Sequence, residues 1–120
     1  MESRAPGVVG AALEDDETWC GLIVDGIHVH PATLKVAINA KQAGKMVLVT
    51  DAMPTVGAVE QTFTIRGETI TAIDGVCATA DGTLSGSDLN MASAVRNTVE
   101  LLEQPIEEAL RMASLYPAEL

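Results

Sequence analysis

Two short apolar segments separated by a helical segment constrain the fold of this chain more than any other feature. Residues 21–25 (GLIVD) and 46–50 (MVLVT) are almost continuously apolar, which predicts strands covered on both faces. Residues 31–43 between them predict a helix that begins at Pro31 and stops before Gly44. A strand, a helix and a strand within about thirty residues predict a parallel pair and an α/β fold.

The rest of the sequence predicts a change of architecture. Residues 61–80 alternate in polarity and are interrupted by Gly67 and Gly75, as expected of small antiparallel hairpins. Residues 81–91 (DGTLSGSDLNM) predict a polar, glycine-rich loop. Two helices should follow, because apolar residues recur at helical spacing. We expect the first to bury Leu89, Ala92, Val95, Val99 and Leu102, and the second, which opens at Pro105, to bury Ile106, Leu110 and Ala113.

Two parallel strands alone make an incomplete sheet. Strands buried on both faces need neighbours on both sides, and residues 1–16 predict only a loop. The sequence contains no internal repeat and no linker that would divide it. We therefore expect residues 1–120 to form a single, incomplete domain, a piece of a larger enzyme.

The composition argues against several classes of protein. A net charge of −10, with one Trp, one Tyr and one Phe, provides neither the basic patch nor the stacking surface of a nucleic-acid-binding protein. The apolar runs are far shorter than a membrane span. The two cysteines form no metal or disulfide pattern. These features favour a reduced, soluble, cytoplasmic protein that binds neither nucleic acid nor membrane.

Asp51 directly follows the second predicted strand. In a barrel, that end of the strand lies at the rim where catalytic groups converge. A carboxylate at this rim can act as a general base that activates water and then passes the proton to a leaving group. Spacing alone favours a second interpretation, in which Asp51 caps the turn before Pro54.

His28 and His30 follow the first predicted strand in the segment DGIHVHP, residues 25–31. His28 lies at the same rim as Asp51, and the sequence leaves open whether it contacts a substrate, binds a metal or is structural. His30 precedes Pro31, which favours a cap on the following helix over a metal ligand. A catalytic zinc or iron site needs three protein ligands, so the case for a metal is weak.

The segment 81–91 is a second candidate for ligand binding. Gly82 and Gly86 let the backbone approach a ligand closely, and Ser85 or Ser87 can cap the following helix, whose N-terminus favours anions. Most such loops are only turns, so the signal is weak.

Four segments together establish a family resemblance. LIVDGIHVHP, MVLVTDAM, DGTLSGSDLNMASAVRN and EEALRMASLYPA closely resemble the C-terminal part of N-acetylglucosamine-6-phosphate deacetylases, members of the amidohydrolase superfamily. The resemblance extends from SRAPGVVGAAL near the start to the end of the chain. It implies a partial (β/α)8 TIM barrel, in which this chain supplies the last two β/α strands and the C-terminal helices. Residues 61–80 would be a β-hairpin segment of an accessory β-sandwich.

The resemblance also implies a reaction and the residues that perform it. The family hydrolyses the acetamide of N-acetylglucosamine-6-phosphate to glucosamine-6-phosphate and acetate, in amino-sugar catabolism. Asp51 would be the catalytic acid and base acting on metal-bound water, and His28 would polarise the acetyl carbonyl. Arg4 would reach into the site of the neighbouring subunit in a homo-oligomer and bind the phosphate of the substrate there. The sugar would be contacted by Leu84, Ser85 and Gly86.

One departure from the family pattern matters most. The family's metal ligands, a glutamate and two histidines, lie on earlier barrel strands that this sequence does not contain. We therefore expect a divalent zinc or iron ion in the complete enzyme only, and little or no hydrolysis by the isolated chain. Its unpaired sheet edge should favour self-association. The alternatives are another amide hydrolase of the superfamily, similar to dihydroorotase or adenine deaminase, and a non-catalytic folding or interaction module.

Overall fold

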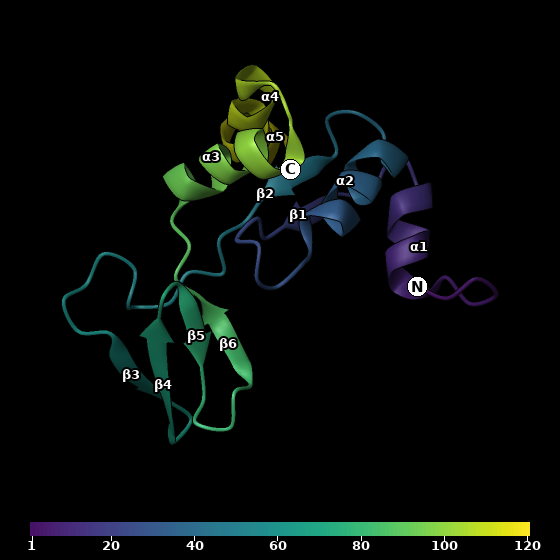
Figure 1. Cartoon of the computed structure of the whole chain (residues 1–120). Coiled ribbons are helices and arrows are strands. Elements are labelled where there is room, and N and C mark those ends of the chain that lie inside the picture. Colours follow the sequence, from purple (N-terminus) through teal and green to yellow (C-terminus); the bar gives the residue numbers. More distant parts are fainter.

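The computed structural model describes all 120 residues as a mixed α/β structure built around two small sheets (Figure 1). The first sheet pairs β1 (Cys20–Leu22) with β2 (Met46–Leu48) in parallel, and α2 (Pro31–Ala40) connects them. The predicted strand–helix–strand unit is thus confirmed, with shorter strands. Two parallel strands do not define a closed barrel, so the partial TIM barrel remains a prediction.

The main hydrophobic core lies between this parallel pair and the helices. All three residues of β2 are buried, as predicted for a strand covered on both faces. The helix α3 (Met91–Leu102) packs against the core through Ala94, Thr98 and Leu102, while Ala92, a predicted core residue, is exposed. The core contains Leu22, Val24, Leu34, Met46, Leu48, Leu89, Ala94, Leu102 and Met112.

The C-terminal helix is continuous but changes its winding. It consists of α4 (Ile106–Leu110), a wider π-helical turn η1 (Arg111–Leu115) and α5 (Tyr116–Glu119). Pro117 lacks an amide hydrogen, and its ring would clash with the carbonyl four residues earlier in a regular α-helix. The wider turn directly before Pro117 accommodates this residue.

This helix buries a different face from the one predicted. Ile106 and Leu110 are 47% and 51% exposed, whereas Ala109 and Met112 are fully buried. The α4 segment packs on α3 and η1 packs on β2. The small side chain of Ala109 allows this close approach of α4 to α3. The prediction was wrong for Ile106 and Leu110, because helical spacing alone does not show which face of the helix meets α3, whereas Ala113 packs partly buried against the core.

The second sheet is antiparallel and contains, in chain order, β3 (Thr62–Ile65), β4 (Glu68–Ile73), β5 (Val76–Ala78) and β6 (Leu84–Ser87). The predicted hairpins are confirmed. Both tight turns have two consecutive residues at positive φ, with values of 53° and 85° at Arg66 and Gly67, and 50° and 83° at Asp74 and Gly75. These are the angles of the hairpin turns that match strand twist. Part of the predicted loop, residues 84–87, is instead a strand, because it pairs with β5.

The N-terminal segment, predicted to be a loop, contains the helix α1 (Gly7–Glu14). Its N-cap residue, Pro6, makes no side-chain cap, so the usual sequence signal is absent. The buried Lys41 instead reaches its C-terminus, where Nζ donates hydrogen bonds to the carbonyls of Ala12, at 2.7 Å, and Asp15. None of the helices combines the length and apolar composition needed to cross a membrane.

Candidate functional site

The carboxyl ends of β1 and β2 lie side by side and lead into the two residues predicted to act on a substrate. Leu22 pairs with Leu48, and the amide of Val49 donates to the carbonyl of Leu22 over 3.0 Å. Asp51 lies three residues beyond the end of β2, and His28 lies six residues beyond the end of β1. Both segments therefore leave the same edge of the parallel pair, which we call the rim.

Asp51 has an unusual backbone and an exposed side chain. Its φ of 53° lies in the left-handed region, which is costly for a residue other than glycine. The turn that follows is capped by Thr50, whose Oγ1 accepts the amide of Ala52 at 3.3 Å. The interpretation of Asp51 as a turn cap is therefore wrong. Its carboxylate makes no hydrogen bond within the chain and is accessible to a ligand.

His28 is oriented by Asp25, a residue that the sequence analysis did not select. Nδ1 of His28 lies 2.6 Å from Oδ2 of Asp25, and Oδ1 of Asp25 accepts the amides of Ile27 and His28 at 2.9 and 3.0 Å. Burial of the Asp25 carboxyl raises its pKa, but these hydrogen bonds oppose the effect and leave the pKa below its ordinary value of 3.8. Asp25 is thus a carboxylate that fixes the orientation of the imidazole.

His30 caps α2, as predicted from its position before Pro31. Its backbone is extended, with φ −61° and ψ 136°, and its Nδ1 accepts the amide of Ala32 at 3.2 Å. This bond satisfies one of the open donors at the start of the helix.

The strand β6 joins the rim to the antiparallel sheet. The amide of Ser87 donates to the carbonyl of Asp51 at 2.8 Å, and the carbonyl of Ser87 accepts the amide of Met53 at 2.9 Å. The three residues predicted to contact the sugar, Leu84, Ser85 and Gly86, precede Ser87 on β6 and are exposed or half-buried. At Gly86 the φ is 73°, and a Cβ atom would collide with the side chain of Met53. Gly86 is therefore required by packing, whatever it binds.

The predicted helix cap at Ser85 or Ser87 is wrong. Asn90 caps α3, and its Oδ1 accepts the amide of Ser93 at 2.8 Å. The strand β6 continues to Ser87 before the chain turns toward α3, and the hydroxyl of Ser87 donates to the carbonyl of Thr50.

Arg4 is not brought to the rim. It is exposed and lies in the N-terminal segment, which extends beyond α1 at the end of the molecule away from the antiparallel sheet (Figure 1). Within one copy of the chain, Arg4 therefore lies away from the rim.

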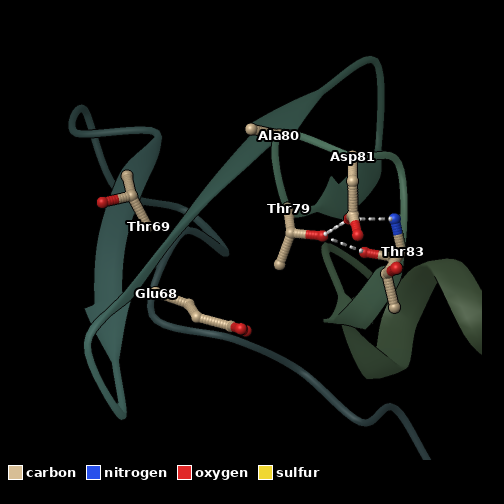
Figure 2. A pocket seen from close by; sticks show the side chains of 6 residues that line it. All are labelled: Glu68, Thr69, Thr79, Ala80, Asp81 and Thr83. Carbon is tan, nitrogen blue, oxygen red and sulfur yellow. Dashed lines mark hydrogen bonds between the residues drawn. The ribbon is translucent and has the colours of Figure 1, made fainter.

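A hollow of about 380 Å³ lies at the turn between β5 and β6 (Figure 2). This turn is at the end of the sheet opposite the rim (Figure 1). Thr79 Oγ1 donates to Asp81 and to the carbonyl of Thr83, and Asp81 also accepts the amide of Thr83 at 3.1 Å. The bond from Thr79, followed by that from Thr83, lowers the pKa of Asp81. These contacts stabilise the turn and have no connection to Asp51.

The chain does not form a metal site. No three His, Cys, Asp or Glu side chains lie close enough together to hold an ion. Neither Asp51 nor His28 therefore belongs to a set of three ligands that could bind zinc or iron within this chain.

Two residues that shape the rim were missed by the sequence analysis. Asp25 ends the first predicted strand and precedes Gly26, a pattern typical of aspartates that accept backbone amides in a turn. That signal was available. Ser87 was named only as a possible helix cap, and its bonds to Thr50 and Asp51 gave no signal because these residues are far away along the chain.

Comparison with known proteins finds relatives that match the whole chain. No family model matches the sequence. A protein of Escherichia coli strain K12, named "Putative N-acetylgalactosamine-6-phosphate deacetylase", is 43% identical over all 120 residues of this chain, which span 71% of that protein. N-acetylgalactosamine-6-phosphate deacetylase of Escherichia coli O157:H7 is also 43% identical over the whole chain, which spans 32% of it. N-acetylglucosamine-6-phosphate deacetylase of Haemophilus influenzae is 38% identical over 117 residues, 96% of this chain and 30% of its own.

Solved structures give the same result. N-acetylglucosamine-6-phosphate deacetylase of Pasteurella multocida superposes with a TM-score of 0.93 at 39% identity, over 98% of this chain and 31% of its own. A variant of the Mycobacterium smegmatis enzyme, in complex with N-acetyl-D-glucosamine-6-phosphate, superposes with a TM-score of 0.89 at 28% identity, over 98% of this chain and 32% of its own.

The similarity along the whole chain places it among deacetylases, which are a class of hydrolases. The chain belongs to the family of N-acetylglucosamine- and N-acetylgalactosamine-6-phosphate deacetylases. It spans 71% of one of the relatives described above, and 30 to 32% of the others.

Proposed function

We propose that this chain forms the C-terminal part of an enzyme that hydrolyses N-acetylglucosamine-6-phosphate to glucosamine-6-phosphate and acetate. The observation that carries the proposal is the rim, where the exposed carboxylate of Asp51 and the imidazole of His28, oriented by Asp25, follow paired strand ends. The similarity to deacetylases along the whole chain supports the same reaction.

Asp51 acts as general base and then as general acid. Its carboxylate takes a proton from the water whose oxygen attacks the acetyl carbon. When the carbon–nitrogen bond breaks, the same proton passes to the departing amine, which leaves as glucosamine-6-phosphate while the acyl group leaves as acetate. The exposed, unpartnered carboxylate of Asp51 suits both transfers.

His28 stabilises the charge that develops on the acetyl oxygen. Asp25 accepts the proton on Nδ1, which leaves Nε2 available to a ligand. When Nε2 is also protonated, it donates a hydrogen bond to the carbonyl oxygen, and this bond strengthens as the oxygen becomes negative.

The other contacts complete the proposal. The segment formed by Leu84, Ser85 and Gly86 contacts the sugar. Arg4 reaches into the site of a neighbouring subunit in a homo-oligomer and binds the phosphate of the substrate there. The residues of this chain do not form a site for the zinc or iron ion that the resemblance implies, so its ligands belong to another part of the enzyme. A second candidate substrate is N-acetylgalactosamine-6-phosphate, because the relatives at 43% identity carry that name.

A fused protein tests the proposal. The upstream part of the Escherichia coli O157:H7 deacetylase, which this chain does not match, is joined to residue 1 of the chain and assayed with both amino-sugar phosphates. We expect the fused protein to release acetate, and Asp51→Asn to lower kcat by about 10²- to 10⁴-fold. The isolated chain, with zinc or iron added, should show no turnover.

The assay also discriminates against the alternatives. Preference for a different amide would indicate another amide hydrolase of the superfamily. A folded but inactive fused protein, or one in which Asp51→Asn has no effect, would favour a non-catalytic module. Glu100→Gln, an exposed change on α3, is the control for a general effect of removing a carboxylate.

A further inference from the structure

We propose that Ser87 is a positioning residue that holds Asp51 in the left-handed backbone conformation from which its carboxylate acts. The inference rests on the proposed role of Asp51 and adds a residue from the antiparallel sheet to the catalytic arrangement. It is carried by the hydrogen bonds between the end of β6 and the segment that follows β2.

Ser87 binds the chain on both sides of Asp51. Its hydroxyl donates to the carbonyl of Thr50, its amide donates to the carbonyl of Asp51 at 2.8 Å, and its carbonyl accepts the amide of Met53 at 2.9 Å. The hydroxyl also accepts the amide of Leu89 at 3.1 Å. Ser87 is 1% exposed, so water does not compete for these bonds.

Asp51 needs such support because its own side chain provides none. A left-handed residue other than glycine persists only where its surroundings fix the backbone. The Asp51 carboxylate forms no hydrogen bond within the chain, and the cap at Thr50 holds only the following amide. The bonds from Ser87 are therefore the contacts that fix the peptide groups around Asp51.

The hydroxyl is the part of Ser87 that a residue without a hydroxyl group cannot replace. Its amide and carbonyl bonds are available to any residue, but only a hydroxyl can donate to Thr50 and accept from Leu89 at the same time. Its removal leaves two polar groups of the backbone without this partner, the amide of Leu89 and the carbonyl of Thr50, which directly precedes Asp51. A second link, from Thr55 Oγ1 to Asp88 Oδ1 at 3.0 Å, keeps the two segments adjacent but does not touch Asp51.

NMR of the 120-residue chain tests the geometry directly. A residue at positive φ gives a strong nuclear Overhauser effect between its own amide and Hα protons. We expect this signal at Asp51 to be lost in Ser87→Ala and retained in Ser87→Thr, which keeps the hydroxyl. Thr98→Ala, which removes an equally buried hydroxyl bonded within α3, should leave the Asp51 signal unchanged. An unchanged signal in Ser87→Ala would overturn the proposal.

Kinetics of the fused protein provide a second measurement. Misplacement of Asp51 should lower kcat by about 10²-fold in Ser87→Ala while KM stays within about twofold, whereas Thr98→Ala should change neither. Equal losses in both variants would overturn the proposal. Ser87→Cys, which keeps the size but bonds weakly, replaces Ser87→Ala if that variant does not fold. If the fused protein shows no turnover that depends on Asp51, the proposed function fails, and the NMR result still decides the role of Ser87.

Discussion

Asp25 and His28 are joined by a hydrogen bond of 2.6 Å between Oδ2 and Nδ1. The other oxygen of the carboxylate accepts the amides of Ile27 and His28, so one side chain orders both the loop and the imidazole. The Asp25 side chain is only 6% exposed, compared with 20% for His28. The pair therefore has a sheltered anchor and an accessible ring, an arrangement suited to presenting Nε2 to a ligand.

Asp25→Asn should weaken the pair with His28 while still providing an acceptor for the backbone amides of the loop. The amide oxygen of asparagine can still accept the two backbone amides, but the charged partner of Nδ1 is lost. We expect the free energy of unfolding to fall by about 1.5–3 kcal/mol, the range for hydrogen bonds to charged groups. Urea unfolding measures this change. Asp16→Asn, at an exposed aspartate without a hydrogen-bonded partner, is the control, and an equal loss there would contradict the assigned role of Asp25.

The same carboxylate predicts a pH dependence. The pKa of Asp25 is lower in the folded chain than its ordinary value of 3.8. The folded state therefore gains stability that is fully present above about pH 4 and is lost as the pH falls through the depressed pKa. Unfolding curves between pH 2.5 and pH 7, chosen as roughly spanning this window, should show the wild-type chain losing its advantage over Asp25→Asn at the acidic end. A difference that stays constant with pH would assign the effect to packing.

Local sequence patterns predicted most of the elements. The apolar runs at β1 and β2, the proline that starts α2 and the hairpins with Gly67 and Gly75 all depend on neighbours in sequence. The elements that were missed depend on distant residues. The helix α1 is capped by Lys41, and β6 is a strand because it pairs with β5.

The features of the candidate site also separate into those that depend on neighbours in sequence and those that depend on distant residues. Asp51 and His28 could be selected as candidates because each follows an apolar run that ends at the rim. The positive φ of Asp51 could not be predicted, because the bonds that impose it come from Ser87 in another sheet. The exposure of Ile106 and Leu110 could not be predicted for a similar reason, because the packing of α4 on α3 determines which face of the helix is buried.

Lys41→Met should release α1 from the rest of the chain. The substitution keeps the aliphatic stem but leaves the carbonyls of Ala12 and Asp15 without their buried donor. We expect a loss of about 1–3 kcal/mol and faster amide hydrogen exchange in α1 than in α3. Lys35→Met removes an exposed pair with Glu103, whose contribution is about 0–1 kcal/mol, and is the matched control. Equal exchange in α1 for the two variants would show that the Lys41 bonds do not hold the helix.

Asp51→Gly separates the cost of the Asp51 backbone from the value of its carboxylate. Glycine adopts positive φ without the penalty borne by other residues, and the Asp51 side chain has no bond in the chain to lose. Since the unfolded chain also gains freedom, the expected net gain in the free energy of unfolding is small, up to about 1 kcal/mol. Turnover by the fused protein should nevertheless fall by about 10²-fold or more.

Asp74→Gly is the matched control for this prediction. Asp74 has a φ of 50°, is exposed and makes no side-chain hydrogen bond, but it lies in the turn between β4 and β5. The two glycine variants should therefore have similar stability, while only Asp51→Gly loses turnover. A clear loss of stability in Asp51→Gly alone would mean that the carboxylate supports the fold. The left-handed backbone would then serve the turn and not a carboxylate poised for proton transfer.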